Sequence, residues 1–202
     1  MKAITQNKKV KYILQLFIII ALIIASIFIY NRFNYTDAIK FKQEMEALNT
    51  EVNLEGNNTH ISLHIPRNNR VKFLSFDELM TNLDKGTEII FFANPADYWS
   101  RKLIPPMLEF ASENKVNIYY YNVENENSEN YQKILARLHN YLSIDTTNED
   151  DVVLERIILP HMFFIKNGEV KAEQLFYEHQ FLYNDEKQKI KDLLFVMLQK
   201  IK

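Results

Sequence analysis

The sequence predicts an α/β domain with a mixed sheet flanked by helices, preceded by one N-terminal transmembrane helix. From Val71 onward, short apolar segments alternate with amphipathic segments, which is typical of an α/β fold. The pair Asn167-Gly168 stands between two strand-like segments, as in a two-residue hairpin turn. Residues 12–30 form an apolar run of about 19 residues, close to the length that spans a bilayer.

The composition is that of a globular chain. The 202 residues are 47% hydrophobic and 25% charged, which is neither a disordered nor a repetitive composition. Because 24 Lys and Arg face 26 Asp and Glu, we expect no nucleic-acid partner. The chain has no cysteine, which excludes disulfides, thiol catalysis and thiolate metal ligands within it.

The apolar run predicts a location. Lysines at positions 2, 8, 9 and 11 precede it, so the positive-inside rule makes residues 1–11 a cytoplasmic tail and residues 12–30 the single pass through the cell membrane. The C-terminal domain is then extracellular. A cleaved signal peptide is the alternative, but the run exceeds the usual apolar region of such peptides and no A-x-A-like site follows.

Residues 31–70 are predicted to form a juxtamembrane helix and linker. Thr36 would cap a helix over "DAIKFKQEMEALN", whose mixed charge favours a solvated stalk. The segment "THISLHIP" alternates as a strand does and ends at Pro66. Because proline cannot donate to a ladder, we expect an edge or linker strand there.

The predicted α/β domain spans residues 71–202. Its first strand is "VKFL", after which Ser75 and Glu78 form a capping box for a helix that Gly86 ends. The strand "TEIIFFAN" lacks alternation, as expected for a central strand covered on both faces. A helix over about residues 98–114 and the strand "VNIYYYNVE" complete a right-handed βαβ unit.

Four further segments complete the predicted domain. The segment "SENYQKILARLHNYL" is an amphipathic helix, and a polar, acidic excursion over residues 143–155 follows it. The hairpin "HMFFIKNGEVKAEQLF" turns at Asn167-Gly168. The chain closes with an amphipathic helix for which Asn184 is the expected cap.

Two motifs in this order resemble the thioredoxin-like superfamily. Its members place a four-residue active-site motif after an apolar strand, then a basic residue and a helix-kinking proline, and here these are Asp97-Tyr98-Trp99-Ser100, Arg101 and Pro105. They also place a cis-proline before a strand and hairpin such as "LPHMFFIKNGEV", and Pro160 takes that position by resemblance. The resemblance implies a thioredoxin-like fold from Val71 to the C-terminus.

The sequence departs from the superfamily where the chemistry resides. Asp97 and Ser100 replace the two cysteines, and Phe91 stands where many thioredoxins carry a buried acid. Ser100 would attack a substrate only with an adjacent base, for which His161 is the candidate. The alternative is that Asp97 caps the helix and Ser100 lies in its first turn. We therefore expect no catalytic residue and no cofactor.

The sequence supports a metal site only weakly. His60 and His64 are four residues apart, but no third zinc ligand is in view, so we expect ordinary surface histidines rather than a zinc site. The cluster Glu149, Asp150 and Asp151 lacks the alternating ligands and the glycine of a calcium loop. We expect no metal partner.

Three functions from different classes are open. The degenerate motif surface would bind an extended peptide or protein by strand-like contacts, and it comprises Asp97, Tyr98, Trp99, Ser100, Pro160 and His161. In that surface Trp99 would either anchor a partner or cover the site from inside. Membrane-tethered, cysteine-poor members of the superfamily resemble accessory proteins of bacteriocin production and export, which implies a redox-inactive module at the outer face of a bacterial membrane. The alternatives are a structural subunit of an envelope secretion or conjugation complex, docking through residues 143–155, and an enzyme, either a serine-based hydrolase or a redox protein borrowing a partner's thiol.

Overall fold

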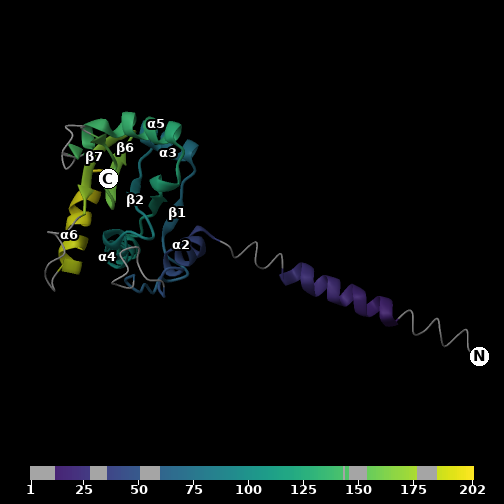
Figure 1. Ribbon diagram of the computed structural model, residues 1–202. Coiled ribbons are helices and arrows are strands. Elements are labelled where there is room, and N and C mark those ends of the chain that lie inside the picture. The colour runs from purple at the N-terminus through teal and green to yellow at the C-terminus, as the bar shows by residue number, and fades with distance from the viewer. Residues whose placement is uncertain (1–11, 28–35, 51–59, 143, 146–153, 177–185) are drawn as a thin grey trace, which may run out of the picture. The chain divides into compact units, whose positions relative to one another are not determined.

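A computed structural model describes residues 12–27, 36–50, 60–142, 144–145, 154–176 and 186–202 (Figure 1). The chain divides into two compact units, residues 1–36 and residues 37–202. In the first unit, residues 12–27 form a helix, and the rest of the predicted span lies outside the described residues. Among the helices that the structure describes, none is both long and apolar enough to cross a membrane. The membrane span over residues 12–30 therefore stays a prediction.

Five strands of the second unit form one mixed sheet. In spatial order they are β1 (Val71–Phe73), β3 (Ile118–Tyr121), β2 (Ile89–Phe92), β6 (His161–Lys166) and β7 (Glu169–Leu175). Strands β1, β3 and β2 are parallel, whereas β6 and β7 are antiparallel to their neighbours. Helix α4 (Tyr98–Asn114) joins β2 to β3, which confirms the predicted βαβ unit.

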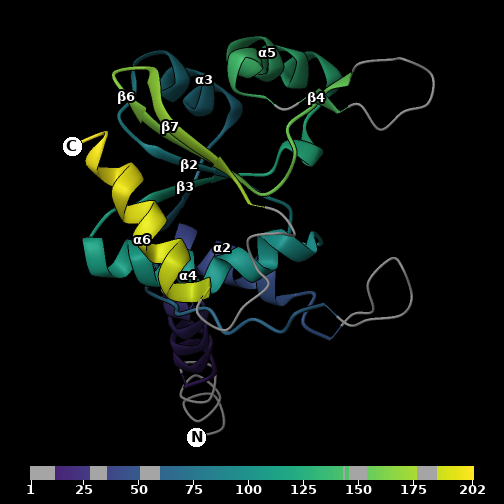
Figure 2. The ribbon, with the colours of Figure 1, turned by 90° about the vertical axis from the view of Figure 1, so that its left-hand side faces the viewer.

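Helices cover both faces of this sheet (Figure 2). One face carries α4 with α2 (Asp37–Glu46) and α6 (Glu186–Gln199), and the other carries α3 (Phe76–Lys85) and α5 (Ser128–Leu138). Successive side chains of β2 serve the two faces in turn, since Phe91 packs with α2, α4 and α6 while Phe92 packs with α3 and α5. This arrangement fits the thioredoxin-like fold that the two motifs imply.

The predicted cap and turn residues act as expected. The amide of Glu78 donates to Ser75 Oγ at 3.4 Å and the amide of Ser75 donates to Glu78 Oε2 at 2.8 Å, which completes the capping box of α3. Gly86 ends α3, but with φ of -75° it does not use the left-handed conformation that only glycine adopts freely. Asn167 and Gly168 do use it, with φ of 53° and 78°, and turn β6 into β7.

Four short elements complete the described fold. The 3₁₀ helices η1 (Val123–Asn125) and η2 (His139–Tyr141) follow β3 and α5. Strands β4 (Ile144–Asp145) and β5 (Leu154–Glu155) pair with each other in a separate sheet. Residues 149–151 and Asn184 lie outside the described residues, so the calcium-loop candidate and the predicted cap of α6 are untested.

The helix predicted as a solvated stalk belongs to the core instead. Phe41 and Met45 of α2 are fully buried, and the Phe41 ring meets Tyr120 of β3 edge-on with centroids 5.2 Å apart. The stalk prediction is wrong because the apolar positions Ala38, Phe41 and Met45 share one helix face beneath the mixed charge. The second compact unit accordingly begins at Asp37, ahead of the boundary predicted at residue 71.

The strand predicted over residues 59–66 does not form in its described part, residues 60–66. Leu63 and Ile65 are buried as the alternation predicts, but polar side chains replace a partner strand. The amide of Leu63 donates to Asn49 Oδ1 at 2.8 Å and its carbonyl accepts from Asn49 Nδ2 at 2.8 Å, while the amide of Ile65 donates to Glu46 Oε1 at 2.6 Å. The alternation of apolar and polar residues therefore indicated which side chains are buried, and not that the segment pairs with another strand.

Candidate functional site

The degenerate motif begins at the N-terminus of α4, where Asp97 is the cap. Its Oδ2 accepts a hydrogen bond from the amide of Ser100 at 2.6 Å. Burial raises the pKa of the Asp97 carboxyl, and the hydrogen bonds from Ser100 and the amide of Trp99 oppose part of that rise. Ser100 is fully buried, and its Oγ accepts from the amide of Asn94 at 3.3 Å. Both residues therefore stabilise the helix start, as the capping interpretation predicts.

His161 belongs to the other face of the sheet. Its neighbours Met162 and Phe164 pack in the core beneath α4, so strand alternation directs His161 and Phe163 toward α3 and α5. The rings of His161 and Phe163 lie 4.2 Å apart between centroids, and His161 Nε2 is 2.5 Å from Glu173 Oε2. The structure thus pairs His161 with Glu173 rather than with Ser100, and the serine–histidine pair that a hydrolase needs does not form.

A cleft of about 490 Å³, which we call the motif cleft, opens beside the cap of α4. Asp97, Glu124 and Tyr131 line it together with residues 156–159, the segment that leads into Pro160. The Leu159-Pro160 peptide is cis, as the resemblance implies. The amide of Ile157 donates to the Tyr131 hydroxyl at 3.2 Å, so this segment is held against α5.

The walls of the motif cleft differ in character. Asp97 and Glu124 supply two carboxyl groups, and Glu124 Oε2 also accepts a hydrogen bond from the side-chain Nδ2 of Asn94. Ile158 and Leu159 are half-buried and offer an apolar surface. Neither Ser100 nor His161 is among the residues that line the cleft.

The two aromatic residues of the motif have different roles. Tyr98 is 52% exposed, and its ring meets Trp99 edge-on at 4.8 Å between centroids. Trp99 is half-buried and packs against the core on the α4 face, with the Lys102 ammonium 5.4 Å from its ring centroid. Tyr98 is therefore the aromatic side chain of the motif that a partner can reach, while Trp99 covers the core.

Arg101, the basic residue after the motif, has a structural role that the sequence did not reveal. It is fully buried, and burial lowers the pKa of its guanidinium. The guanidinium donates to the carbonyls of Met45, Pro95 and Ile61 and to the side chain of Asn49. It therefore fastens α2 and residue 61 to the start of α4.

The motif cleft also contains residues that sequence reasoning missed. Glu124, Tyr131 and Arg156 come from three segments whose approach depends on the fold. One sequence signal could have located part of this cleft: residues 156–159 directly precede Pro160, where the resemblance already implied a binding surface. Phe91, at the position of the missing acid, is fully buried among apolar side chains.

The histidine pair shows no sign of a metal site. His64 is exposed and His60 is half-buried on a segment without a ladder. Within the described part of the chain, no group of three or more His, Asp or Glu side chains gathers closely enough to hold a metal ion.

No protein-family model and no curated protein matches the chain. Among solved structures, thioredoxin O2 from Arabidopsis thaliana in its oxidised state is similar, with 18% sequence identity and a TM-score of 0.42. The match covers 71% of this chain and 100% of that chain.

Proposed function

We propose that this protein is a redox-inactive thioredoxin-like module that binds an extended polypeptide in the motif cleft. The observation that carries the proposal is the open cleft between the cap of α4 and residues 156–159, at a site whose Ser100 and His161 are both buried. A chain without cysteine cannot form the mixed disulfide that thiol exchange requires. Binding through main-chain and side-chain contacts needs no sulfur.

The walls of the cleft favour a polypeptide of particular character. Residues 156–158 are not part of any strand or helix, so their main chain can pair with an extended segment in the manner of an added strand. Ile158 and Leu159 favour apolar side chains, and the carboxylates of Asp97 and Glu124 favour a basic one.

We also propose that the module acts at the outer face of a bacterial membrane, as an accessory protein of bacteriocin production or export. The apolar run over residues 12–30 and the lysines before it support this location. The resemblance to cysteine-poor, membrane-tethered members of the superfamily supports the role. Protease added to intact protoplasts should remove the region after Tyr30, and protection of that region would reverse the orientation.

The experiment that tests the binding function is site-specific photocrosslinking in cells. A photoreactive residue at position 98 or 158 should capture one defined partner, while the same residue at position 195 on α6 should not. Phe195 is a matched control because it is 48% exposed, close to the 52% of Tyr98. Neither residue lines the motif cleft, but Tyr98 directly follows the lining residue Asp97, whereas Phe195 lies on α6. The captured peptide, identified by mass spectrometry, should be extended and carry a basic residue.

Point variants measure how much each residue contributes. Tyr98→Ala should weaken capture by on the order of 2 kcal/mol if the ring is a hot spot, and Phe195→Ala should leave it unchanged. Trp99→Ala removes packing against the core as well, so its effect is compared with a stability measurement. Ser100→Ala should not change capture, because its hydroxyl faces Asn94. Contacts that map to residues 143–155 instead of the motif cleft would favour the structural-subunit alternative.

A further inference from the structure

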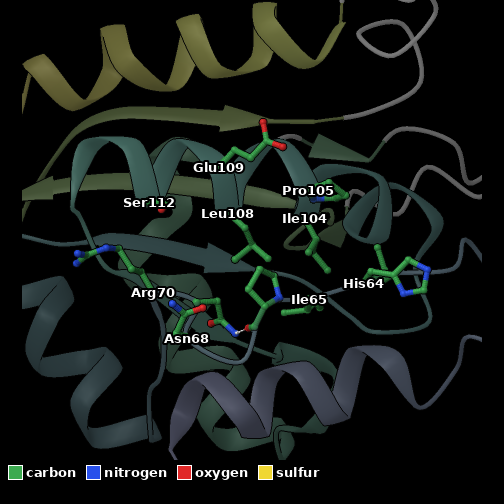
Figure 3. A pocket seen from close by; sticks show the side chains of 12 residues that line it. His64, Ile65, Asn68, Arg70, Ile104, Pro105, Leu108, Glu109 and Ser112 are labelled. Carbon is green, nitrogen blue, oxygen red and sulfur yellow. Dashed lines mark hydrogen bonds between the residues drawn. The ribbon is translucent and has the colours of Figure 1, made fainter.

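A second pocket, of about 300 Å³, lies between α4 and residues 63–70 (Figure 3). It shares no lining residue with the motif cleft. Its apolar walls come from both segments and consist of Leu63, Ile65, Pro66, Ile104, Pro105 and Leu108. The volume is at the lower end of the range for small-molecule sites, which is roughly 300 to 1,000 Å³.

The segment that forms one wall of this pocket is held by its own hydrogen bonds. Asn69 donates from Nδ2 to the carbonyls of Ala38 and Pro66, each at 2.8 Å, and its Oδ1 accepts from the amide of Val71 at 3.0 Å. The amide of Ile65 is bound to Glu46. The wall therefore keeps its shape without a ligand, as is usual for small-molecule sites.

One end of the pocket is polar and positively charged. In Figure 3, Arg70, Asn68 and Ser112 lie toward one end of the pocket and His64 lies at the other. In the described part of the chain, the guanidinium of Arg70 has no ion pair. Glu109, the acid among the lining residues, points away from residues 64–70 and pairs with Lys187 and Lys191 of α6.

The size of the pocket limits its occupant. A water molecule takes up about 30 Å³ of liquid, so the pocket holds roughly ten water volumes and suits a ligand of about ten non-hydrogen atoms. The apolar walls require an apolar body, whereas Arg70, the Asn68 amide and the Ser112 hydroxyl offer hydrogen-bond donors at one end. A carboxylate is the group that an arginine fork binds best.

We propose that this pocket binds a small amphipathic monoanion, with its apolar body against Ile65, Ile104 and Leu108 and its carboxylate at Arg70. A cation with the same apolar body would meet the like charge of Arg70, and a neutral analogue would lack the charge-assisted hydrogen bond. The site is independent of the polypeptide-binding function proposed above.

The test is a binding titration of the full chain with octanoate, which has about ten non-hydrogen atoms and so fits the volume. The methyl groups of Ile65, Ile104 and Leu108 report binding through their NMR shifts. Octanoate should give saturable shifts at these methyls, octan-1-ol should bind more weakly, and octylammonium should bind at least tenfold more weakly than octanoate. Ser112→Phe should abolish the shifts with all three probes, since residue 112 is exposed and lines the pocket.

Arg70→Gln removes the positive charge of residue 70 but keeps a polar side chain there. It should weaken octanoate about fivefold, as expected for a partly exposed ion pair, and leave octan-1-ol binding unchanged, which also shows that the pocket is intact. Arg67→Gln is the matched control, because Arg67 is an exposed arginine on the same segment that does not line the pocket. Equal affinity for the three probes, equal effects of the two variants, or the absence of saturable shifts at the three methyls would each overturn the proposal.

Discussion

Replacing Arg101 tests whether one buried cation holds α2 and residue 61 to the motif helix. Its Nε and one terminal nitrogen bond the carbonyl of Ile61 at 3.0 and 2.6 Å. The other terminal nitrogen bonds the carbonyls of Met45 at 2.7 Å and Pro95 at 3.0 Å. The fifth bond reaches Asn49 Oδ1 at 2.8 Å. In Arg101→Met the apolar stem keeps its packing while all five bonds are lost.

The magnitude follows from which oxygens are left without a donor. Asn49 Oδ1 still accepts a hydrogen bond from the amide of Leu63, so losing the bond from Arg101 costs little there. The carbonyls of Met45, Ile61 and Pro95 lose their described donor, and an unsatisfied buried acceptor costs about 1 to 3 kcal/mol. Removing the buried charge offsets part of this cost, because the guanidinium is desolvated. We expect a net loss of about 3 kcal/mol in the free energy of unfolding.

The assay is urea unfolding of the full chain in one mild detergent, followed by the fluorescence of the single tryptophan. In a thermal scan followed by the same fluorescence, the melting temperature should fall by about 6 to 12 °C, at about 2 to 4 °C per kcal/mol for a unit of this size. The stability of Arg101→Lys should lie between that of Arg101→Met and that of wild type. Arg67→Met, at an exposed arginine, should stay within about 0.5 kcal/mol of wild type. If Arg101→Met were as stable as Arg67→Met, the inferred role of these five bonds would be wrong.

Three further predictions concern the turn, the cap and the missing sulfur. Gly168→Ala should cost on the order of 3 kcal/mol in calorimetric or urea unfolding, because φ is 78° and an added Cβ would lie 1.9 Å from the carbonyl oxygen of Asp84. Asn167→Gly, at the other left-handed position of the same turn, is the control and should be tolerated. Burial raises the pKa of Asp97 above its unfolded value, so protonation of this carboxyl stabilises the folded protein. That stabilisation is fully present below a pH of about 3.9 and is lost as the pH rises through the folded pKa. Asp97→Asn, which keeps a capping side chain, should therefore be more stable than wild type at pH 7 and equal to it near pH 3, and an unchanged difference across that range would contradict the shift. The purified protein should show no reductase or isomerase activity above buffer in an insulin assay, since it cannot form a mixed disulfide.

Much of the fold could be predicted because its signals are local. The capping box of Ser75 and Glu78 and the turn at Asn167-Gly168 each involve residues within four positions of one another, so their side chains decide the backbone there. The unbroken apolar run of β2 predicted a strand covered on both faces, and the structure confirms it. The place of Asp97 as a cap was also readable, because a capping bond spans only three residues.

The candidate site depended on contacts that no local pattern records. Whether Ser100 and His161 meet was decided by strand alternation, which directs His161 to the sheet face opposite α4. The motif cleft joins Asp97, Glu124 and residues 156–159, whose approach requires β2, β3 and β6 to lie side by side.

The sequence by itself determined the elements, their order and the loss of thiol chemistry, because these follow from periodicity, caps and residue identity. Only the tertiary structure decided that α2 joins the core and that Asn49 and Glu46 replace a strand partner for residues 63–65. Arg101 gives the physical reason. Its partners lie up to 56 residues away along the chain, and only packing of separate segments brings their oxygens within hydrogen-bond distance of one guanidinium.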